Sequence, residues 1–136
     1  MKKKTFFPLL ALIAFLSINS CSKSAPEPAT TTVSLDGKWV GTYNNGAGGP
    51  ANYFALTFKS GGALVVHANN SLIPDVANGS WAMVSDSIKA TYSYSGSSAV
   101  YSLAAKFTGT STLLSGTVGL SPATTGEAVF TVNKQP

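Results

Sequence analysis

The chain is poor in the residues that build metal and redox centres. Its 136 residues include no arginine, one cysteine (Cys21) and one histidine (His67). A protein metal site needs several ligands, and no second cysteine or histidine can help to complete one. A single cysteine also leaves no partner for a disulfide. We therefore expect no metal, no cofactor and no disulfide.

Charge is also scarce, and much of it lies at the N-terminus. The whole chain carries a net charge of +4, but Lys2, Lys3 and Lys4 precede a long apolar run. Beyond residue 20, six lysines stand against five carboxylates, which gives a net charge of +1. This leaves no basic patch of the kind that binds nucleic acid, so we expect no nucleic-acid partner.

Motifs of nucleophilic and phosphate chemistry are missing too. The sequence contains no Gly-x-Ser-x-Gly, no Walker loop and no Gly-x-Gly-x-x-Gly before a helix. Four carboxylates follow residue 30, and each falls at the end of an expected strand or in a loop: Asp36, Asp75, Asp86 and Glu127. No convergent pair is indicated, so we expect a protein without catalytic activity.

Residues 1–20 have the pattern of an export signal. Three lysines at positions 2–4 are followed by an apolar stretch of 13 residues, Phe6 to Ile18. A membrane-spanning helix needs about 20 apolar residues, so this stretch is too short to span.

The end of this signal, Ile18-Asn19-Ser20-Cys21, resembles the lipobox of bacterial lipoproteins. The resemblance implies cleavage before Cys21 and a diacylglyceryl thioether on its sulfur, usually with an added fatty acyl chain such as palmitate. Two acyl chains suffice for stable membrane anchoring. Ser22 follows the cysteine where an aspartate would suggest inner-membrane retention, which favours the outer membrane of a Gram-negative envelope. The alternative is an ordinary signal peptide with an unrelated cysteine.

Residues 21–34 read as a disordered tether and residues 35–136 as one domain. The tether is rich in proline, serine and threonine, which bury little apolar surface and favour extended coil.

The domain predicts eight strands and no helix. Alternating apolar residues, separated by turn residues such as Ser60-Gly61-Gly62, mark them at 38–44, 52–59, 63–68, 79–84, 88–94, 99–107, 113–120 and 127–133. Short turns favour antiparallel neighbours, and closure would remove both sheet edges. We therefore predict an all-β, eight-stranded antiparallel up-and-down barrel. A β-sandwich is the alternative.

The start of the first strand, Gly37-Lys38-Trp39, resembles the Gly-x-Trp motif of the lipocalin and calycin group. The resemblance implies that Trp39 plugs the narrow end of the barrel, under an arginine near the last strand. Because the chain lacks arginine, Lys134 is the available substitute. It either covers Trp39 or is a solvated terminal lysine.

The inward faces of the strands carry many aromatic residues, which leaves two possibilities for the barrel interior. The aromatics fill it or leave only a shallow mouth, which we favour slightly, or they line a site for a small apolar ligand. The candidate ligand-binding residues are Tyr43, Trp81, Tyr92, Tyr94 and Tyr101.

Together these observations predict a membrane-anchored envelope lipoprotein with a lipocalin-like barrel that binds a small apolar ligand. The alternative is an interaction, structural or inhibitor module that contacts an envelope protein through the loops at 45–50 and 69–78. Asp86-Ser87-Ile88 also resembles an O-glycosylation sequon of exported bacterial proteins, with Ser87 as the acceptor.

Overall fold

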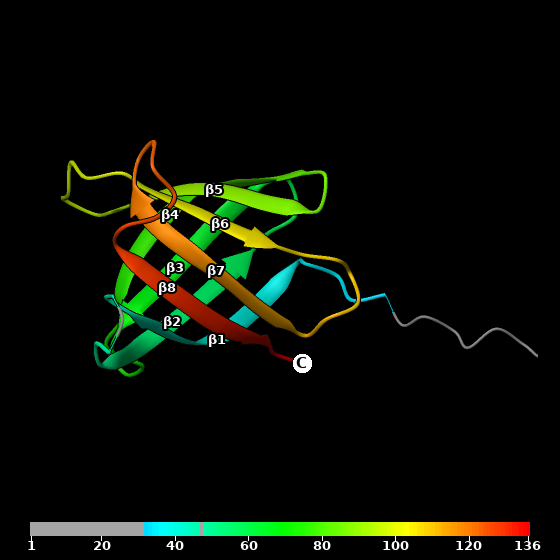
Figure 1. Cartoon of the computed structure of the whole chain (residues 1–136), viewed down its shortest axis with the longest axis horizontal. Helices are drawn as coiled ribbons and strands as arrows, with labels where there is room; N and C mark the ends of the chain where they lie inside the picture. The colour runs from blue at the N-terminus through cyan, green and yellow to red at the C-terminus, as the bar shows by residue number, and fades with distance from the viewer. Residues whose placement is uncertain (1–31, 47) are drawn as a thin grey trace, which may run out of the picture.

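The computed structural model describes residues 32–46 and 48–136, which form eight strands and no helix. The strands curve into one barrel (Figure 1). They are β1 (Gly37–Asn44), β2 (Ala51–Phe58), β3 (Ala63–Asn69), β4 (Asp75–Val84), β5 (Ser87–Tyr94), β6 (Tyr101–Lys106), β7 (Leu113–Leu120) and β8 (Ala128–Lys134). None of the described residues forms a helix that is long and apolar enough to span a membrane.

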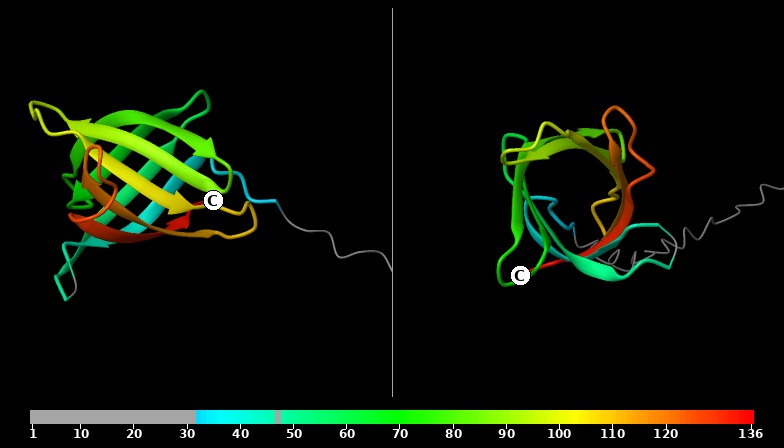
Figure 2. Two further views of the ribbon diagram at one scale, coloured as in Figure 1. Left: turned by 45° about the horizontal axis from the view of Figure 1, so that its top comes forward. Right: turned by 90° about the vertical axis from the view of Figure 1, so that its left-hand side faces the viewer.

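Each strand pairs antiparallel with its neighbours in sequence, and β1 pairs with β8 to close the barrel. The closing register sets Trp39 opposite Lys134 and Tyr43 opposite Phe130. The view along the barrel shows a continuous ring of strands (Figure 2). The predicted fold class is therefore confirmed. Because each strand has both neighbours within residues 37–134, the described chain contains every strand that closure requires.

One strand is longer than its sequence suggests. β4 begins at Asp75, four residues before the predicted start at Gly79, because Val76 and Ala77 pair with His67 and Val66 of β3. Pro74 and the polar residues around it have the composition of a loop. The pairing partner nevertheless extends the ladder, and Ala77 is fully buried. The loop predicted at 69–78 therefore shrinks to 70–74, which places Asp75 on the barrel wall.

The two ends of the barrel differ. One end, here called the closed end, carries the turns at 59–62 and 85–86, the loop at 107–112, and residues 32–36 and 135–136. The other, the open end, carries the loops at 45–50, 70–74, 95–100 and 121–127. The described chain thus enters the barrel at the closed end (Figure 1).

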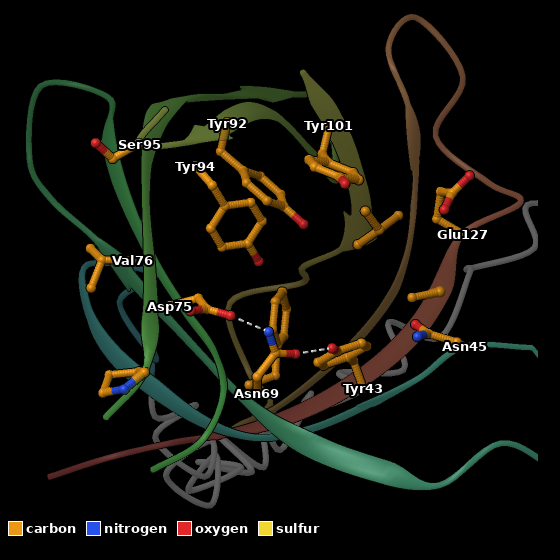
Figure 3. A pocket seen from close by; sticks show the side chains of 14 residues that line it. Tyr43, Asn45, Asn69, Asp75, Val76, Tyr92, Tyr94, Ser95, Tyr101 and Glu127 are labelled. Atoms are coloured by element: carbon orange, nitrogen blue, oxygen red, sulfur yellow. Dashed lines mark hydrogen bonds between the residues drawn. The ribbon is translucent and has the colours of Figure 1, made fainter. Parts of the chain in front are cut away.

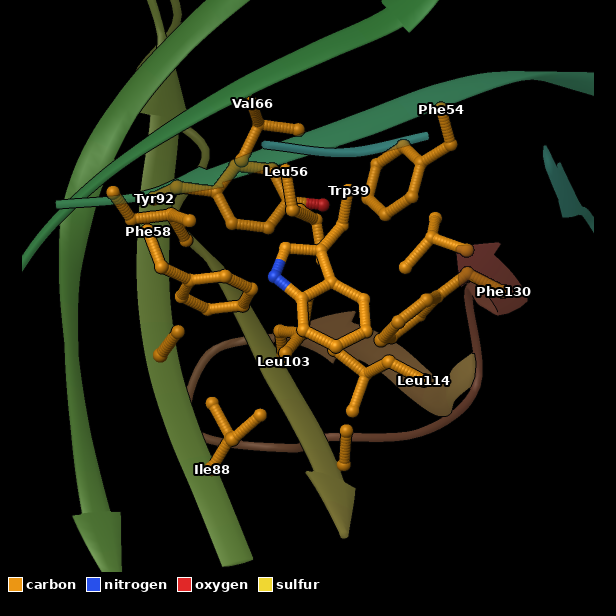
Figure 4. Packing of buried hydrophobic residues seen from close by; sticks show 14 of the residues in the cluster. Trp39, Phe54, Leu56, Phe58, Val66, Ile88, Tyr92, Leu103, Leu114 and Phe130 are labelled. Atoms are coloured by element: carbon orange, nitrogen blue, oxygen red, sulfur yellow. The ribbon is translucent and has the colours of Figure 1, made fainter. Parts of the chain in front are cut away.

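Buried apolar side chains fill the closed half of the barrel. Trp39 lies at the centre of this cluster, surrounded by Leu56, Phe58, Leu103 and Leu114, all with at most 1% of their surface exposed (Figure 4). Side chains alternate along a strand, so the inward set of each strand meets the others in one core.

Residues 33–35 complete the closed end. The amide of Val33 donates to the carbonyl of Gly109 at 2.6 Å, and Leu35 is buried. Val33 and Ser34 fall in the segment that the sequence assigns to the tether, yet both contact the barrel. The ordered domain therefore begins slightly before residue 35.

Candidate ligand-binding site

The open half of the barrel holds a cavity of about 610 Å³ (Figure 3). Its wall contains the buried side chains of Phe54 and Val118 and the half-buried Ala128, and its rim carries exposed polar residues such as Asn45 and Ser95. Small-molecule sites in proteins typically enclose 300–1,000 Å³. The interior is therefore filled at one end and hollow at the other, so the barrel is not filled throughout.

Three tyrosines form one corner of the cavity. Tyr92 and Tyr94 share the inward face of β5, and Tyr101 stands opposite Tyr92 on β6. The rings of Tyr92 and Tyr101 stack with centroids 5.5 Å apart and an interplanar angle of 20°. Tyr94 stands nearly perpendicular to both, with centroid distances of 6.0 Å and 5.9 Å.

A polar chain of three side chains crosses the cavity wall. The Tyr43 hydroxyl donates to Oδ1 of Asn69, and Nδ2 of Asn69 donates to Oδ2 of Asp75 (Figure 3). This pattern fixes the orientation of the Asn69 amide, because a flipped amide would set oxygen against carboxylate. Asn69 ends β3 with a φ of +71°, a conformation in which asparagine is enriched.

Burial raises the pKa of three tyrosine hydroxyls that line the cavity. It raises the pKa of Tyr94 to about 12, with smaller contributions from Tyr43, Tyr101 and Asp75. Burial also raises the pKa of Tyr92, and of Tyr43, where the Asp75 carboxylate adds to the effect. The cavity wall therefore presents neutral phenols, which can both donate and accept hydrogen bonds.

The inward glycines Gly41 and Gly116 do not create the cavity. A Cβ on Gly116 would lie 2.7 Å from the ring of Phe130, and one on Gly41 would lie 2.0 Å from the backbone oxygen of Thr131. Both glycines are thus sites of close packing. The hollow arises where large side chains stop, beyond Phe54 and Phe130, whose ring centroids are 5.4 Å apart.

Trp39 and Lys134 lie together at the closed end. The Lys134 ammonium stands 5.2 Å from the centroid of the indole ring and also donates to the carbonyls of Ser34 (2.9 Å) and Asp36. The indole N–H of Trp39 donates to the carbonyl of Leu35 at 2.8 Å. Lys134 thus occupies the position that the resemblance gives to an arginine.

Of the five candidate ligand-binding residues, four line the cavity and one does not. Tyr43, Tyr92, Tyr94 and Tyr101 converge there. Trp81 lies towards the closed end instead, packed edge-on against Phe58 at 5.5 Å, and its N–H donates to the carbonyl of Lys59 at 3.1 Å. Trp81 is inward-facing as predicted, but it belongs to the packed half of the barrel.

Among the lining residues that the predicted ligand-binding set did not include are Asn69, Asp75 and Glu127. Asp75 and Glu127 stand on opposite sides of the mouth (Figure 3). The register of β3 and β4 places Asp75 opposite Ala68 on the inward face, and no sequence pattern indicates that pairing.

The other predicted sites lie away from the cavity. Ser87 begins β5 at the closed end, and its hydroxyl donates to Asp86 at 3.2 Å. His67 projects from the outer face of β3, where its Nδ1 is buried without a hydrogen-bond partner among the described residues. Cys21 falls outside the described residues.

Within residues 32–46 and 48–136, no three histidine, cysteine or carboxylate side chains gather as a metal site would require. Comparison with known proteins found no match: no family model fits the chain, and no curated protein or solved structure is significantly similar to it. The function must therefore be inferred from the geometry of the cavity.

Proposed function

We propose that this chain is a non-catalytic binding protein of the bacterial envelope that holds a small, largely apolar molecule in the open half of its barrel. The observation that carries the proposal is the 610 Å³ cavity, whose lining combines aromatic and apolar side chains with polar and charged ones. A few polar groups at the rim, above all the chain Tyr43–Asn69–Asp75, would orient the ligand. Small-molecule sites typically combine apolar and aromatic side chains that surround the ligand with a few polar groups that orient it.

The plugged end supports the same role. Trp39 and its neighbours seal the barrel beneath the cavity, so a ligand enters and leaves through the mouth alone. A lipocalin-like relationship, which the Gly37-Lys38-Trp39 motif suggests, would imply the same arrangement of one closed and one open end.

The proposed anchor fits this orientation. With lipid on Cys21, the tether would reach the domain at the closed end, where residues 33–35 pack. The mouth lies at the opposite end of the barrel and would face away from the membrane. Replacement of Cys21 by alanine should abolish fatty acid incorporation and membrane fractionation; unchanged labelling would refute the anchor.

The binding role is testable with residues 32–136, which contain all eight strands. A neutral apolar probe such as N-phenylnaphthylamine should bind with a fluorescence increase and a stoichiometry of one. Ala128→Trp fills the cavity from its wall and should abolish binding, whereas Val129→Trp adds the same bulk to the outer face of β8. Equal binding by both variants, with unchanged thermal unfolding, would overturn the proposal. Native mass spectrometry of the purified chain should reveal a retained molecule.

One observation favours a second candidate, an interaction with an envelope protein. Leu72 and Ile73, at the tip of the 70–74 loop, expose 89% and 83% of their surface. Oδ1 of Asn70 accepts from both of their amides, which holds the tip in a defined turn. Under this hypothesis, the double change Leu72→Ser and Ile73→Ser removes a crosslinked partner in cells but leaves probe binding intact.

A further inference from the structure

The charged side chains of the barrel are segregated between its two ends. All five lysines of the described chain lie in the closed half, at strand ends or in the adjoining turn: Lys38, Lys59, Lys89, Lys106 and Lys134. The cavity has no lysine in its lining, and its charged residues at neutral pH are Asp75 and Glu127. Charges of one sign around a cleft raise the local electrostatic potential and attract ligands of the opposite charge. The mouth is therefore electrostatically suited to a cation and hostile to an anion.

The tyrosine corner adds a second attraction for positive charge. The stacked pair Tyr92–Tyr101 and the perpendicular Tyr94 pack against one another, with ring centroids 5.5–6.0 Å apart, and all three line the cavity. Aromatic faces attract ammonium groups and form the walls of the cages that recognise quaternary ammonium ligands. Here the three rings would form one wall of such a cage, with Asp75 as the other. Unlike a carboxylate, such a cage does not require an N–H donor on the ligand.

The hydrogen-bond chain leaves one oxygen of the Asp75 carboxylate without a donor. Donation runs from Tyr43 to Asn69 and from Asn69 to Oδ2 of Asp75, so both steps orient the carboxylate. Oδ1 of Asp75 accepts no hydrogen bond from the residues that the structure describes. Asp75 also lies close enough to Tyr94 and Tyr43 to influence both hydroxyls.

The cavity changes from apolar at its base to charged at its rim, and a matching ligand must have the same two parts. The deeper wall is apolar, formed by Phe54 and Val118, whereas both carboxylates lie at the exposed rim. We propose that the cavity binds a cationic amphiphile, an amine or quaternary ammonium whose apolar body rests on Phe54 and Val118 while its charge lies between Asp75 and the Tyr94 ring. This inference rests on the proposed binding function and narrows it to one chemical class.

The decisive experiment compares three ligands that share one alkyl chain: the trimethylammonium ion, the alcohol and the carboxylate. Each displaces the neutral probe from residues 32–136, below its micelle concentration and at low ionic strength. The ammonium should bind roughly tenfold more tightly than the alcohol, and the carboxylate should bind more weakly than both. Added salt should weaken the binding of the ammonium alone.

Two isosteric variants test whether the preference for the ammonium ligand depends on the carboxylate at the mouth. Asp75→Asn should reduce the preference for ammonium over alcohol several-fold, and alcohol binding should not change. Asp86→Asn removes a carboxylate from the closed end and should leave both affinities as they are. Thermal unfolding of each variant separates a loss of charge from a loss of fold, and Tyr94→Leu provides an independent loss of the cage without any change of charge.

The possible outcomes test the cationic ligand class separately from the binding function. If the three ligands bind alike, or the carboxylate binds best, the cationic class is wrong and the binding function stands. If Asp86→Asn lowers ammonium binding as much as Asp75→Asn, the effect is one of general surface charge and the cage is wrong. If neither the probe nor any ligand binds the folded chain, the binding function itself is refuted.

Discussion

At the scale of single residues, the closed end depends on Lys134. Its ammonium lies over Trp39 and donates to two carbonyls of the segment that precedes β1. A cation–π contact contributes about 0.5–1 kcal/mol at a partly exposed site, and a hydrogen bond from a charged donor contributes about 1.5–3 kcal/mol. A flexible lysine can therefore join strand β8, the plug and the incoming chain at one point.

Replacing Lys134 by methionine should destabilise the domain by about 1–2 kcal/mol. The aliphatic stem remains and the three polar contacts disappear, but their summed contribution is reduced because Lys134 is only half-buried and water replaces the lost partners. The free energy of unfolding in urea measures the loss. Lys89→Met is the matched control, since Lys89 is exposed on β5, and its change should stay within about 0.5 kcal/mol. Equal losses in both variants would show that Lys134 is an ordinary surface lysine.

Tyr94 makes a prediction for alkaline pH. Its pKa is about 12 in the folded protein, against an ordinary value of 10.0. Between these values the unfolded chain binds fewer protons than the folded one, so the free energy of unfolding falls as pH rises. Below pH 10 this tyrosine adds no pH dependence. Tyr94→Phe should flatten the decline, and Tyr53→Phe, on the outer face of β2, should not; equal slopes would contradict the burial of the phenol.

At the scale of elements, three strands owe their close approach to an inward glycine. Added Cβ atoms on Gly41, Gly79 and Gly116 would lie 2.0, 1.9 and 2.3 Å from the backbone oxygens of Thr131, Thr91 and Ala104. Each contact is with the neighbouring strand, which cannot yield as a side chain can. Barrels need such positions because tilted strands must bend to close.

Gly41→Ala should therefore destabilise the barrel by about 3 kcal/mol, at the upper part of the range for overpacking, because it separates the closing pair β1 and β8. Hydrogen exchange of the β1 and β8 amides should accelerate before that of β4 and β5. Thr42→Ala, exposed on the outer face of the same strand, is the control and should preserve both quantities. A stable Gly41→Ala barrel with protected β1 amides would contradict the close approach.

Some residues of the cavity could be predicted from the pattern of single strands, and others could not. Alternation along β5 and β6 places Tyr92, Tyr94 and Tyr101 inward without any knowledge of the structure. Asp75 could not be recognised as a lining residue, because it follows Pro74 in a segment of loop composition and joins the sheet only through its partner Ala68. The cavity could not be predicted from the sequence either, because it depends on how far along the barrel axis the large aromatic side chains extend.

At the scale of the whole molecule, the barrel is polarised. Its closed half carries five lysines and the two carboxylates Asp36 and Asp86, and its mouth carries Asp75 and Glu127. The five lysines and two carboxylates give that end a net side-chain charge of +3, and one of the lysines, Lys106, lies 3.6 Å from Asp86. The proposed lipid anchor would hold the same end near the membrane. Charge and tether would thus favour one orientation, with the mouth directed away from the lipid.

Residues 32–136 should therefore bind weakly to vesicles that contain phosphatidylserine and not to vesicles of phosphatidylcholine, as measured by co-sedimentation at low salt. Each lysine near an anionic surface contributes about 1 kcal/mol, and the attraction fades within a Debye length of about 8 Å at physiological salt. Lys38→Gln combined with Lys59→Gln and Lys89→Gln should abolish the binding. Asp75→Asn with Glu127→Gln raises the net charge at the mouth and should leave it nearly unchanged, because the mouth points away from the surface. Stronger binding by that second variant would show that the domain meets the membrane with its mouth, and the orientation would be wrong.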